Sequence, residues 1–194
     1  MKIHGQCAGT FPSYIPKTDE ERLQNHKKFF DEYRNLSWVV TEKIDGTSGT
    51  FFWKDGEFHV CTRNNEISPN DGNVYATVAT VYGLAERLKA NGKNIAIQGE
   101  VFGPKIQGNK YKSYRPGMLV FSIFNIDTQK HIEYEEMVFT LELLNSMETQ
   151  FAAIKMVPII DENFVIGDKS FDDILTMADG ISLLENVPRE GLEL

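Results

Sequence analysis

Residues 38–62, WVVTEKIDGTSGTFFWKDGEFHVCT, contain three short runs rich in β-branched and aromatic residues. The runs cover residues 38–44, 50–53 and 58–62, and such residues fit the pleated surface of a strand. An Asp-Gly pair separates each run from the next, and this pair favours a tight hairpin turn. The stretch therefore predicts an antiparallel β-meander.

The rest of the chain mixes helical and strand patterns. Helices are predicted where apolar residues recur at helical spacing after a start signal, at 18–36 (with a capping box of Thr18 and Glu21), 73–91, 134–147 and 170–180. Further strands are predicted at 95–100, 118–126, 157–160 and 164–166. Because helices and strands do not alternate strictly, we expect an α+β fold of mainly antiparallel sheets with flanking helices. No repeat or linker interrupts the chain, so residues 1–194 are expected to form one domain.

The composition excludes several classes of protein. The chain has 194 residues, 41% of them hydrophobic, and a net charge of −8, which is typical of a globular domain and not of a disordered chain. No apolar run approaches the ~20 residues of a membrane span, and the first residues lack the apolar centre of a signal peptide. Two cysteines, Cys7 and Cys61, form no metal-binding motif. We expect a cytoplasmic monomer without membrane contact.

A local basic stretch stands out in this acidic chain. Residues 103–117, GPKIQGNKYKSYRPG, carry Lys105, Lys110, Lys112 and Arg115 and no acidic residue. Because proteins that bind nucleic acid by charge alone usually have a basic excess, nucleic-acid contact here has to come from such a patch. An ordinary solvated loop explains the stretch equally well when it is taken alone.

The segment with the most chemical content is TEKIDGTS, residues 41–48. On a strand, Lys43 and Asp45 project from one face and Glu42 from the other. A lysine amine is a nucleophile only without its proton, so the lysine would need desolvation or a nearby cation, such as a divalent metal on a substrate phosphate. A solvated lysine at a hairpin corner is the alternative, and a single KxDG motif does not decide between them.

Four further short motifs follow KxDG in order. They are CTRNN with Arg63, QGE with Glu100, FN with Phe124, and REGL with Glu190. Together they resemble the covalent nucleotidyltransferase superfamily of ATP-dependent polynucleotide ligases and capping enzymes, and most closely its RNA-ligase branch. The resemblance extends over nearly the whole chain, from FPSYIPKTDEERLQN to PREGL. It implies the adenylyltransferase domain of an ATP-dependent RNA ligase.

The resemblance implies that Lys43 attacks the α-phosphate of ATP and becomes Lys-AMP. AMP then passes to an RNA 5′-phosphate, and a 3′-hydroxyl displaces it to seal the ends. Glu42 would contact the adenine amino group, Phe124 would stack on adenine, and Phe121 would be left in the core. Glu100 would hold the ribose, and Arg22 would lie near the ATP phosphates.

The remaining roles concern the metal and the RNA. The resemblance implies that Asp45, Glu100 and Glu190 bind Mg²⁺ or Mn²⁺, largely through water. Arg63 would serve both AMP and the incoming RNA end. The stretch 103–111 is the part most similar to RNA ligases, and it overlaps the basic patch. Composition and resemblance therefore agree that RNA ends are the partner.

The match breaks at the C-terminus. Family members continue after the EG motif with an apolar strand and a KxK pair on the α-phosphate, whereas this chain reads EGLEL, with Glu193 at a usually apolar position. No sizeable accessory domain is evident, so we expect a shortened chain with slow self-adenylylation. The alternatives are a nucleotide- or RNA-end-binding remnant that does not catalyse, and a DNA ligase or capping guanylyltransferase. Residues 103–111 argue against the last two.

Overall fold

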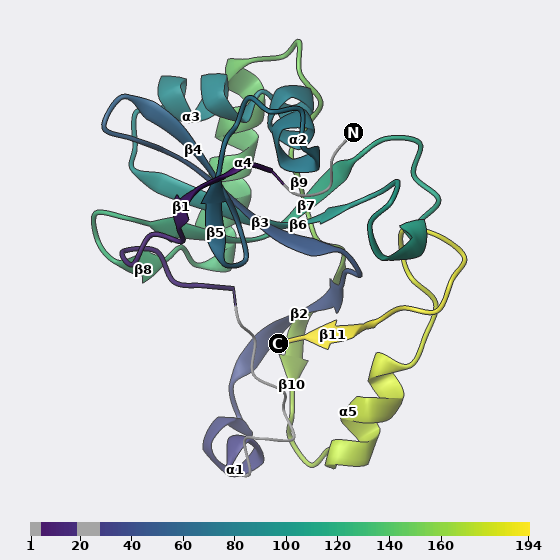
Figure 1. Ribbon diagram of the computed structural model, residues 1–194. Helices are drawn as coiled ribbons and strands as arrows, with labels where there is room; N and C mark the ends of the chain where they lie inside the picture. The colour runs from purple at the N-terminus through teal and green to yellow at the C-terminus, as the bar shows by residue number, and fades with distance from the viewer. Residues whose placement is uncertain (1–4, 19–27) are drawn as a thin grey trace. The chain divides into compact units, whose positions relative to one another are not determined.

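The computed structural model describes residues 5–18 and 28–194, and the chain divides into two compact units (Figure 1). The large unit comprises Met1–Thr18 and Asp45–Met156, and the small unit comprises Asp19–Ile44 and Val157–Leu194. The boundary falls between Ile44 and Asp45, inside the KxDG motif. Both units combine helices with mainly antiparallel strands, which confirms the predicted fold class.

The large unit is built on one sheet with the strand order β1-β5-β4-β3-β6-β7-β8. Its neighbouring strands are antiparallel, and β9 pairs with β7 in parallel. The strands are β1 (Cys7–Thr10), β3 (Thr47–Lys54), β4 (Glu57–Thr62), β5 (Asn65–Ile67), β6 (Ile95–Phe102), β7 (Gly117–Asn125), β8 (Lys130–His131) and β9 (Lys155–Met156). The predicted strands at 50–53, 58–62, 95–100 and 118–126 are therefore confirmed.

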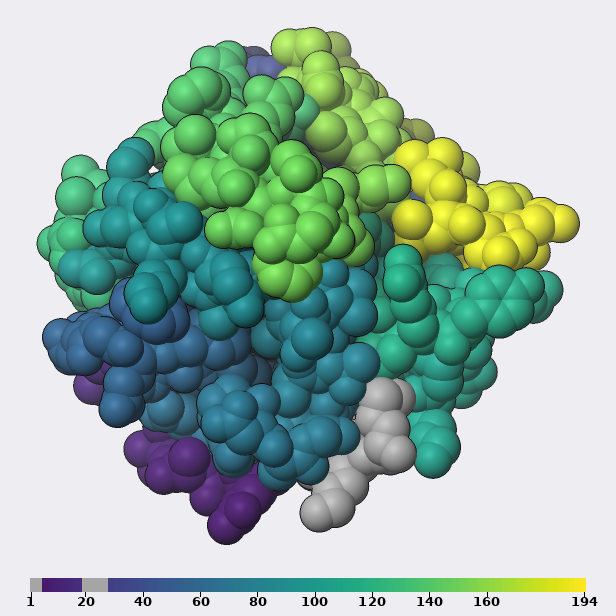
Figure 2. All heavy atoms as spheres, turned by 90° about the horizontal axis from the view of Figure 1, so that it is seen from above, coloured from purple at the N-terminus to yellow at the C-terminus, as the bar shows by residue number. Residues whose placement is uncertain are grey.

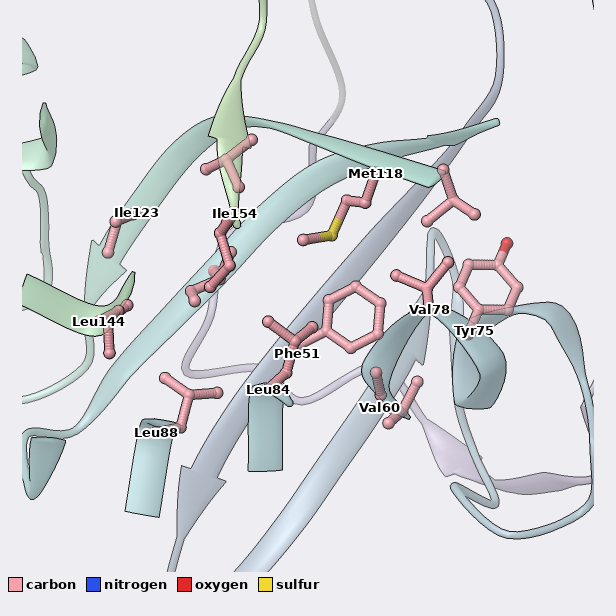
Figure 3. Close-up of a cluster of buried hydrophobic side chains, with 14 of the residues drawn as sticks. Phe51, Val60, Tyr75, Val78, Leu84, Leu88, Met118, Ile123, Leu144 and Ile154 are labelled. Atoms are coloured by element: carbon pink, nitrogen blue, oxygen red, sulfur yellow. The ribbon is translucent and has the colours of Figure 1, made fainter. Parts of the chain in front are cut away.

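Both faces of this sheet are covered. On one face, Phe51 and Val60 pack against apolar residues of α2 (Val74–Tyr82), α3 (Leu84–Asn91) and α4 (Tyr134–Met147), as Figure 3 shows. On the other face, Phe52 and Phe124 pack against Phe11 and Ile15 of the N-terminal segment. Burial on two sides fixes the register of the central strands, because a slip by one residue would exchange the two sets of side chains.

The predicted helix 73–91 is wrong as a single element, because it is two helices. Gly83 lies between α2 and α3 in the left-handed region, with φ at +57°. Its amide caps α2 by donating to the carbonyl oxygens of Ala79 and Thr80. A Cβ at this position would overlap the ring of Phe151. Only glycine meets both demands without strain.

The predicted meander is also wrong at its first turn. Strand β2 (Ser37–Lys43) does not pair with β3 but lies in the sheet of the small unit, between β10 (Ile159–Val165) and β11 (Gly191–Glu193). Both edges of β2 are thus occupied, and β3 is likewise paired on both sides, by β4 and β6. The Asp-Gly pair therefore carries the chain from one sheet to the other and does not form a hairpin.

The described residues of the small unit also include two helices. Helix α1 covers Phe29–Tyr33, within the predicted helix 18–36. The predicted capping box lies partly outside the described residues, because Glu21 does. The Thr18 hydroxyl makes a hydrogen bond of 2.5 Å with the hydroxyl of Ser48. The predicted C-terminal helix is α5 (Phe171–Ala178), which begins with a capping box of Ser170 and Asp173.

The two predicted short strands 157–160 and 164–166 are one irregular strand, β10. Among the described residues, no helix is long and apolar enough to cross a membrane.

Candidate active site

Lys43 is the last residue of β2, where it pairs with Gly191 at the start of β11. The strand pairing brings Glu190 to the same end of the small sheet, and its Oε1 lies 3.9 Å from Nζ of Lys43. The two side chains are 41% and 39% exposed. The predicted nucleophile is therefore within reach of a ligand and next to one of the predicted metal-binding carboxylates.

Glu42 points the other way and is fully buried. Its Oε2 accepts a hydrogen bond of 2.8 Å from the amide of Leu183, in a hairpin closed by hydrogen bonds from Arg189 to Gly180 and from Ser182 to Val187. Its Oε1 is also buried and has no hydrogen-bond partner among the described residues. A buried carboxylate oxygen without a donor is costly, so this atom fits a site for a ligand's N–H group.

The loop at residues 103–117 holds Asp45. The backbone amide of Asp45 donates a 2.8 Å hydrogen bond to the hydroxyl oxygen of Tyr111, and Nζ of Lys110 lies 3.8 Å from Oδ2 of Asp45. Tyr111 is buried and meets the ring of Phe102 edge-on, with 5.6 Å between centroids. Tyr111 was not among the predicted residues of this loop, although an aromatic residue inside a polar loop indicates that part of the loop is anchored.

The glycine of KxDG is explained by close packing. A Cβ on Gly46 would overlap the carbonyl oxygen of Val101 and lie 3.0 Å from Cγ of Glu100. Gly46 thus lets the chain after Asp45 pass directly over the end of β6. Glu100 itself lies in strand β6, where it pairs with Ser48 of β3.

Glu100 and Phe124 share one face of the large sheet. Side chains alternate along β6, so Ala96, Gln98 and Glu100 lie on one face, and Phe124 pairs with Ala96 across the β6–β7 ladder. The fold therefore brings both predicted nucleotide-binding residues to one surface. Between them, Gln98 donates a 2.9 Å hydrogen bond to the carbonyl oxygen of Pro16, which ties the N-terminal segment across this face.

The two phenylalanines of β7 differ from the prediction in their burial. Phe124, the predicted adenine-stacking residue, is only 4% exposed and meets the ring of His131 edge-on at 5.2 Å. Phe121, expected in the core, is partly exposed. A bulge in β7 explains the exposure of Phe121. Gln98 pairs with Ser122 and Gly99 with Val120, so Phe121 has no partner in the β6–β7 ladder.

The other predicted residues lie at the surface or outside the described residues. Arg63 is exposed in the turn between β4 and β5, next to Asn64, whose carbonyl oxygen accepts from Phe11 and whose side chain accepts from Lys17. Arg22 lies outside the described residues. Of the predicted RNA contacts, Lys105, Lys112 and Arg115 are exposed, and Lys110 is partly buried.

The predicted metal ligands are spread over both units. Asp45 and Glu100 belong to the large unit and Glu190 to the small one. In the described part of the chain, no three His, Cys, Asp or Glu side chains gather to hold a metal ion directly. Carboxylate oxygens suit Mg²⁺ and Mn²⁺, and such ions commonly complete their shell with water and substrate phosphates.

These features define an α+β fold of the nucleotidyltransferase type, with the KxDG motif at the passage between its two sheets. A sequence model of the RNA ligase family matches residues 36–192. The chain therefore belongs to the RNA ligase family. A search of curated protein sequences found no match.

Solved structures of Naegleria gruberi RNA ligase are similar over the whole described fold. A variant with ATP and Mn is 35% identical, with a TM-score of 0.91, covering 99% of this chain and 55% of that one. The structure with PPi is 36% identical, with a TM-score of 0.91 and coverage of 98% and 55%. A variant with AMP and Mn is 35% identical, with a TM-score of 0.87 and coverage of 98% and 55%. The chain thus spans about half the length of these ligases.

Proposed function

We propose that this chain is the adenylyltransferase domain of an ATP-dependent RNA ligase, with Lys43 as the nucleophile. The observation that carries the proposal is the position of Lys43 at the end of β2, 3.9 Å from Glu190 of the EG motif. These residues are far apart in the sequence, and the pairing of β2 with β11 brings them together. Membership of the RNA ligase family supports the assignment.

The first step is transfer of AMP to the enzyme. The Lys43 ammonium group gives one proton to solvent, the neutral amine forms a bond from Nζ to the α-phosphorus of ATP, and Nζ releases a second proton to solvent as the phosphoramidate forms. The bond from that phosphorus to the bridging oxygen breaks, and pyrophosphate leaves with the electron pair. A bound Mg²⁺ or Mn²⁺ would neutralise negative charge on the phosphates. ATP, AMP and PPi are ligands of the similar N. gruberi structures, and we carry them over to this chain.

The residues of this chain bind and orient the nucleotide. The unpartnered Oε1 of Glu42 would accept a hydrogen bond from the adenine amino group, which distinguishes adenine from guanine. Glu100 would contact the ribose, and Phe124, on the same sheet face, would stack on the base. Arg63 would contact AMP. Asp45, Glu100 and Glu190 would hold the metal, largely through water.

The later steps involve RNA ends. An oxygen of the RNA 5′-phosphate attacks the phosphorus of Lys-AMP, and the bond to Nζ of Lys43 breaks as Nζ takes protons from solvent, which gives a 5′–5′ adenylylated RNA. The RNA 3′-hydroxyl then gives its proton to solvent and bonds to the 5′-phosphorus, and the bond from that phosphorus to the bridging oxygen breaks, which releases AMP. The exposed cations Lys105, Lys112 and Arg115 would bind the RNA phosphates.

Incubation with ATP labelled on the α-phosphate and Mg²⁺ or Mn²⁺ tests the proposal. We expect label on wild-type protein and none on Lys43→Ala. Lys89→Ala, at an exposed position of α3, is the matched control and should keep the label. Full labelling of Lys43→Ala would contradict the assignment of the nucleophile.

A rise in melting temperature with AMP but no adduct would support a binding role without catalysis. Comparison of ATP with GTP, and of nicked RNA with nicked DNA, would separate RNA ligases from capping enzymes and DNA ligases.

A further inference from the structure

The loop at residues 103–117 is a folded segment and not a loose connection. Its ends are held together because Phe102 pairs with Gly117 in the β6–β7 ladder. Within it, the side chain of Asn109 makes two hydrogen bonds of 3.0 Å to the backbone of Ser113. In Figure 1 the loop, in teal, extends away from the β6 and β7 strands of the large unit.

The backbone of this loop adopts conformations that L-residues rarely adopt. Four of its non-glycine residues have positive φ angles, between +41° and +71°: Lys105, Gln107, Asn109 and Lys112. Such a backbone persists only where surrounding contacts hold it. The contacts at Asn109, and the buried ring of Tyr111 against Phe102, supply them. The backbone that carries the exposed side chains of the loop is therefore held in one conformation.

The arrangement places an aromatic ring in solvent among cations. Tyr114 is fully exposed, more so than any other large hydrophobic or aromatic residue in the described chain. Lys112 and Arg115, on either side of it in the sequence, are also exposed, and so is Lys105. The atoms of this loop, teal-green in Figure 2, form part of the surface of the large unit. An exposed aromatic ring beside exposed cations is the combination that single-stranded nucleic-acid sites use, with the ring against a base and the cations on the phosphates.

We propose that Tyr114 is a stacking platform for an unpaired base of the RNA substrate. The proposal rests on the proposed function and extends it to a substrate class, RNA with a single-stranded nucleotide near the reacting end. Stacking suits the ring because every base has a flat π-face. Lys112, Arg115 and Lys105 contact the phosphates on either side of that base. Lys110 and Tyr111 of the same loop contact Asp45, so the platform is joined to the KxDG motif.

Binding of a 5′-phosphorylated single-stranded RNA that carries one 2-aminopurine tests the platform. Fluorescence anisotropy gives the affinity, and quenching of 2-aminopurine reports stacking. We expect Tyr114→Ala to weaken binding roughly 5- to 150-fold and to remove the quenching. Tyr114→Phe keeps the ring and is expected to stay within about twofold of wild type. The matched control is Phe139→Ala on α4, an aromatic residue that is 65% exposed outside the loop, which should bind RNA like wild type.

Several outcomes would overturn the platform. They are wild-type affinity in Tyr114→Ala, an equal loss in Phe139→Ala, or no binding of the RNA by wild type. An unchanged melting temperature of Tyr114→Ala would exclude misfolding as the cause of lost binding, because the ring makes no buried contact. The proposed function is tested separately by labelling wild-type protein with ATP in the absence of RNA. If the wild-type protein is not labelled, the catalytic assignment is contradicted. The RNA-binding measurement still tests the platform independently.

Discussion

The amide of Asp45 donates a hydrogen bond of 2.8 Å to the hydroxyl oxygen of Tyr111, across 66 positions of sequence. Asp45 belongs to the KxDG motif and Tyr111 to the basic loop. Asp45 lies between the end of β2 and the start of β3, so its amide belongs to neither strand ladder. Because the chain changes sheets there, the amide needs another acceptor, and the loop supplies one.

Tyr111→Phe is expected to slow Lys-AMP formation while the fold persists. The variant keeps the ring against Phe102 but leaves the Asp45 amide without its acceptor, which costs about 1 kcal/mol of unfolding free energy. A small displacement of a reacting group has a large kinetic effect, so we expect labelling to slow on the order of tenfold. Tyr33→Phe, which removes a hydroxyl from a partly exposed tyrosine of α1, should alter neither quantity. Urea unfolding and the labelling time course measure both, and an unchanged rate in Tyr111→Phe would show that the hydrogen bond is only structural.

Glu42→Gln is expected to weaken nucleotide binding without destabilising the apo protein. The amide oxygen of glutamine can still accept from Leu183, but its NH₂ group replaces the free Oε1 and cannot accept from adenine. A hydrogen bond to a charged acceptor contributes about 1.5–3 kcal/mol, so AMP should bind roughly 10- to 150-fold more weakly. The AMP-dependent rise in melting temperature measures this, with Glu57→Gln, at an exposed position of β4, as control. An undiminished rise would rule out Glu42 as the adenine contact.

Gly83→Ala is expected to destabilise the large unit more than Gly92→Ala. Both glycines have positive φ, +57° and +68°, so alanine strains the backbone by about 1 kcal/mol at each. At Gly83 the new Cβ also overlaps Phe151, whereas at Gly92 it meets nothing within 4 Å. Overpacking adds about 1–3 kcal/mol, which gives roughly 2–4 kcal/mol in total at Gly83. Urea unfolding of the two variants checks the difference, and equal losses would contradict the overlap.

His131 is expected to reduce stability as the pH falls through the range just below 6.5. Burial lowers the pKa of His131 from its ordinary value of 6.5, so the unfolded chain binds the proton first. The contribution is therefore intact above the unfolded pKa and is lost as the pH falls toward the folded pKa. Protonation would also affect the contacts of the ring with Ser122, at 2.8 Å, and with Phe124. NMR titration should place the His131 midpoint below 6.5, and His131→Asn should flatten the pH profile of unfolding there. A midpoint at or above 6.5 would contradict this.

Local patterns predicted most elements, and their failures have physical causes. Helix α4 has the bounds predicted from its apolar spacing, because four buried positions recur along one helix face. The prediction of a single helix over 73–91 was wrong because a glycine inside an apolar pattern can either continue a helix or end it. At Gly83 the packing of Phe151 against the backbone requires a glycine, and the helix ends there. The short strands β1, β5 and β11 were not predicted, because three or four residues carry too little periodicity.

The candidate site residues were chosen from the sequence, and the structure shows which of them lie close together. Lys43, Glu100 and Glu190 were chosen from motifs, and strand pairing places Glu190 at Lys43 and Glu100 on the face of Phe124. Tyr111 and Tyr114 were missed, although both lie in the stretch singled out for its charge. Their difference in burial could not be read from the sequence, because positive φ angles and long-range hydrogen bonds decide it.

The amino-acid sequence by itself determined the α+β class, most helices and strands, and the residue types available for chemistry. These depend on hydrophobic period, turn residues and short motifs, which are local properties of the chain. Tertiary structure alone decided that β2 leaves the expected meander for a sheet with β10 and β11, because which strand takes a free edge depends on segments more than a hundred residues away. That pairing places Lys43 beside Glu190. It also leaves Asp45 between the two sheets in the sequence, where its amide donates a hydrogen bond to Tyr111.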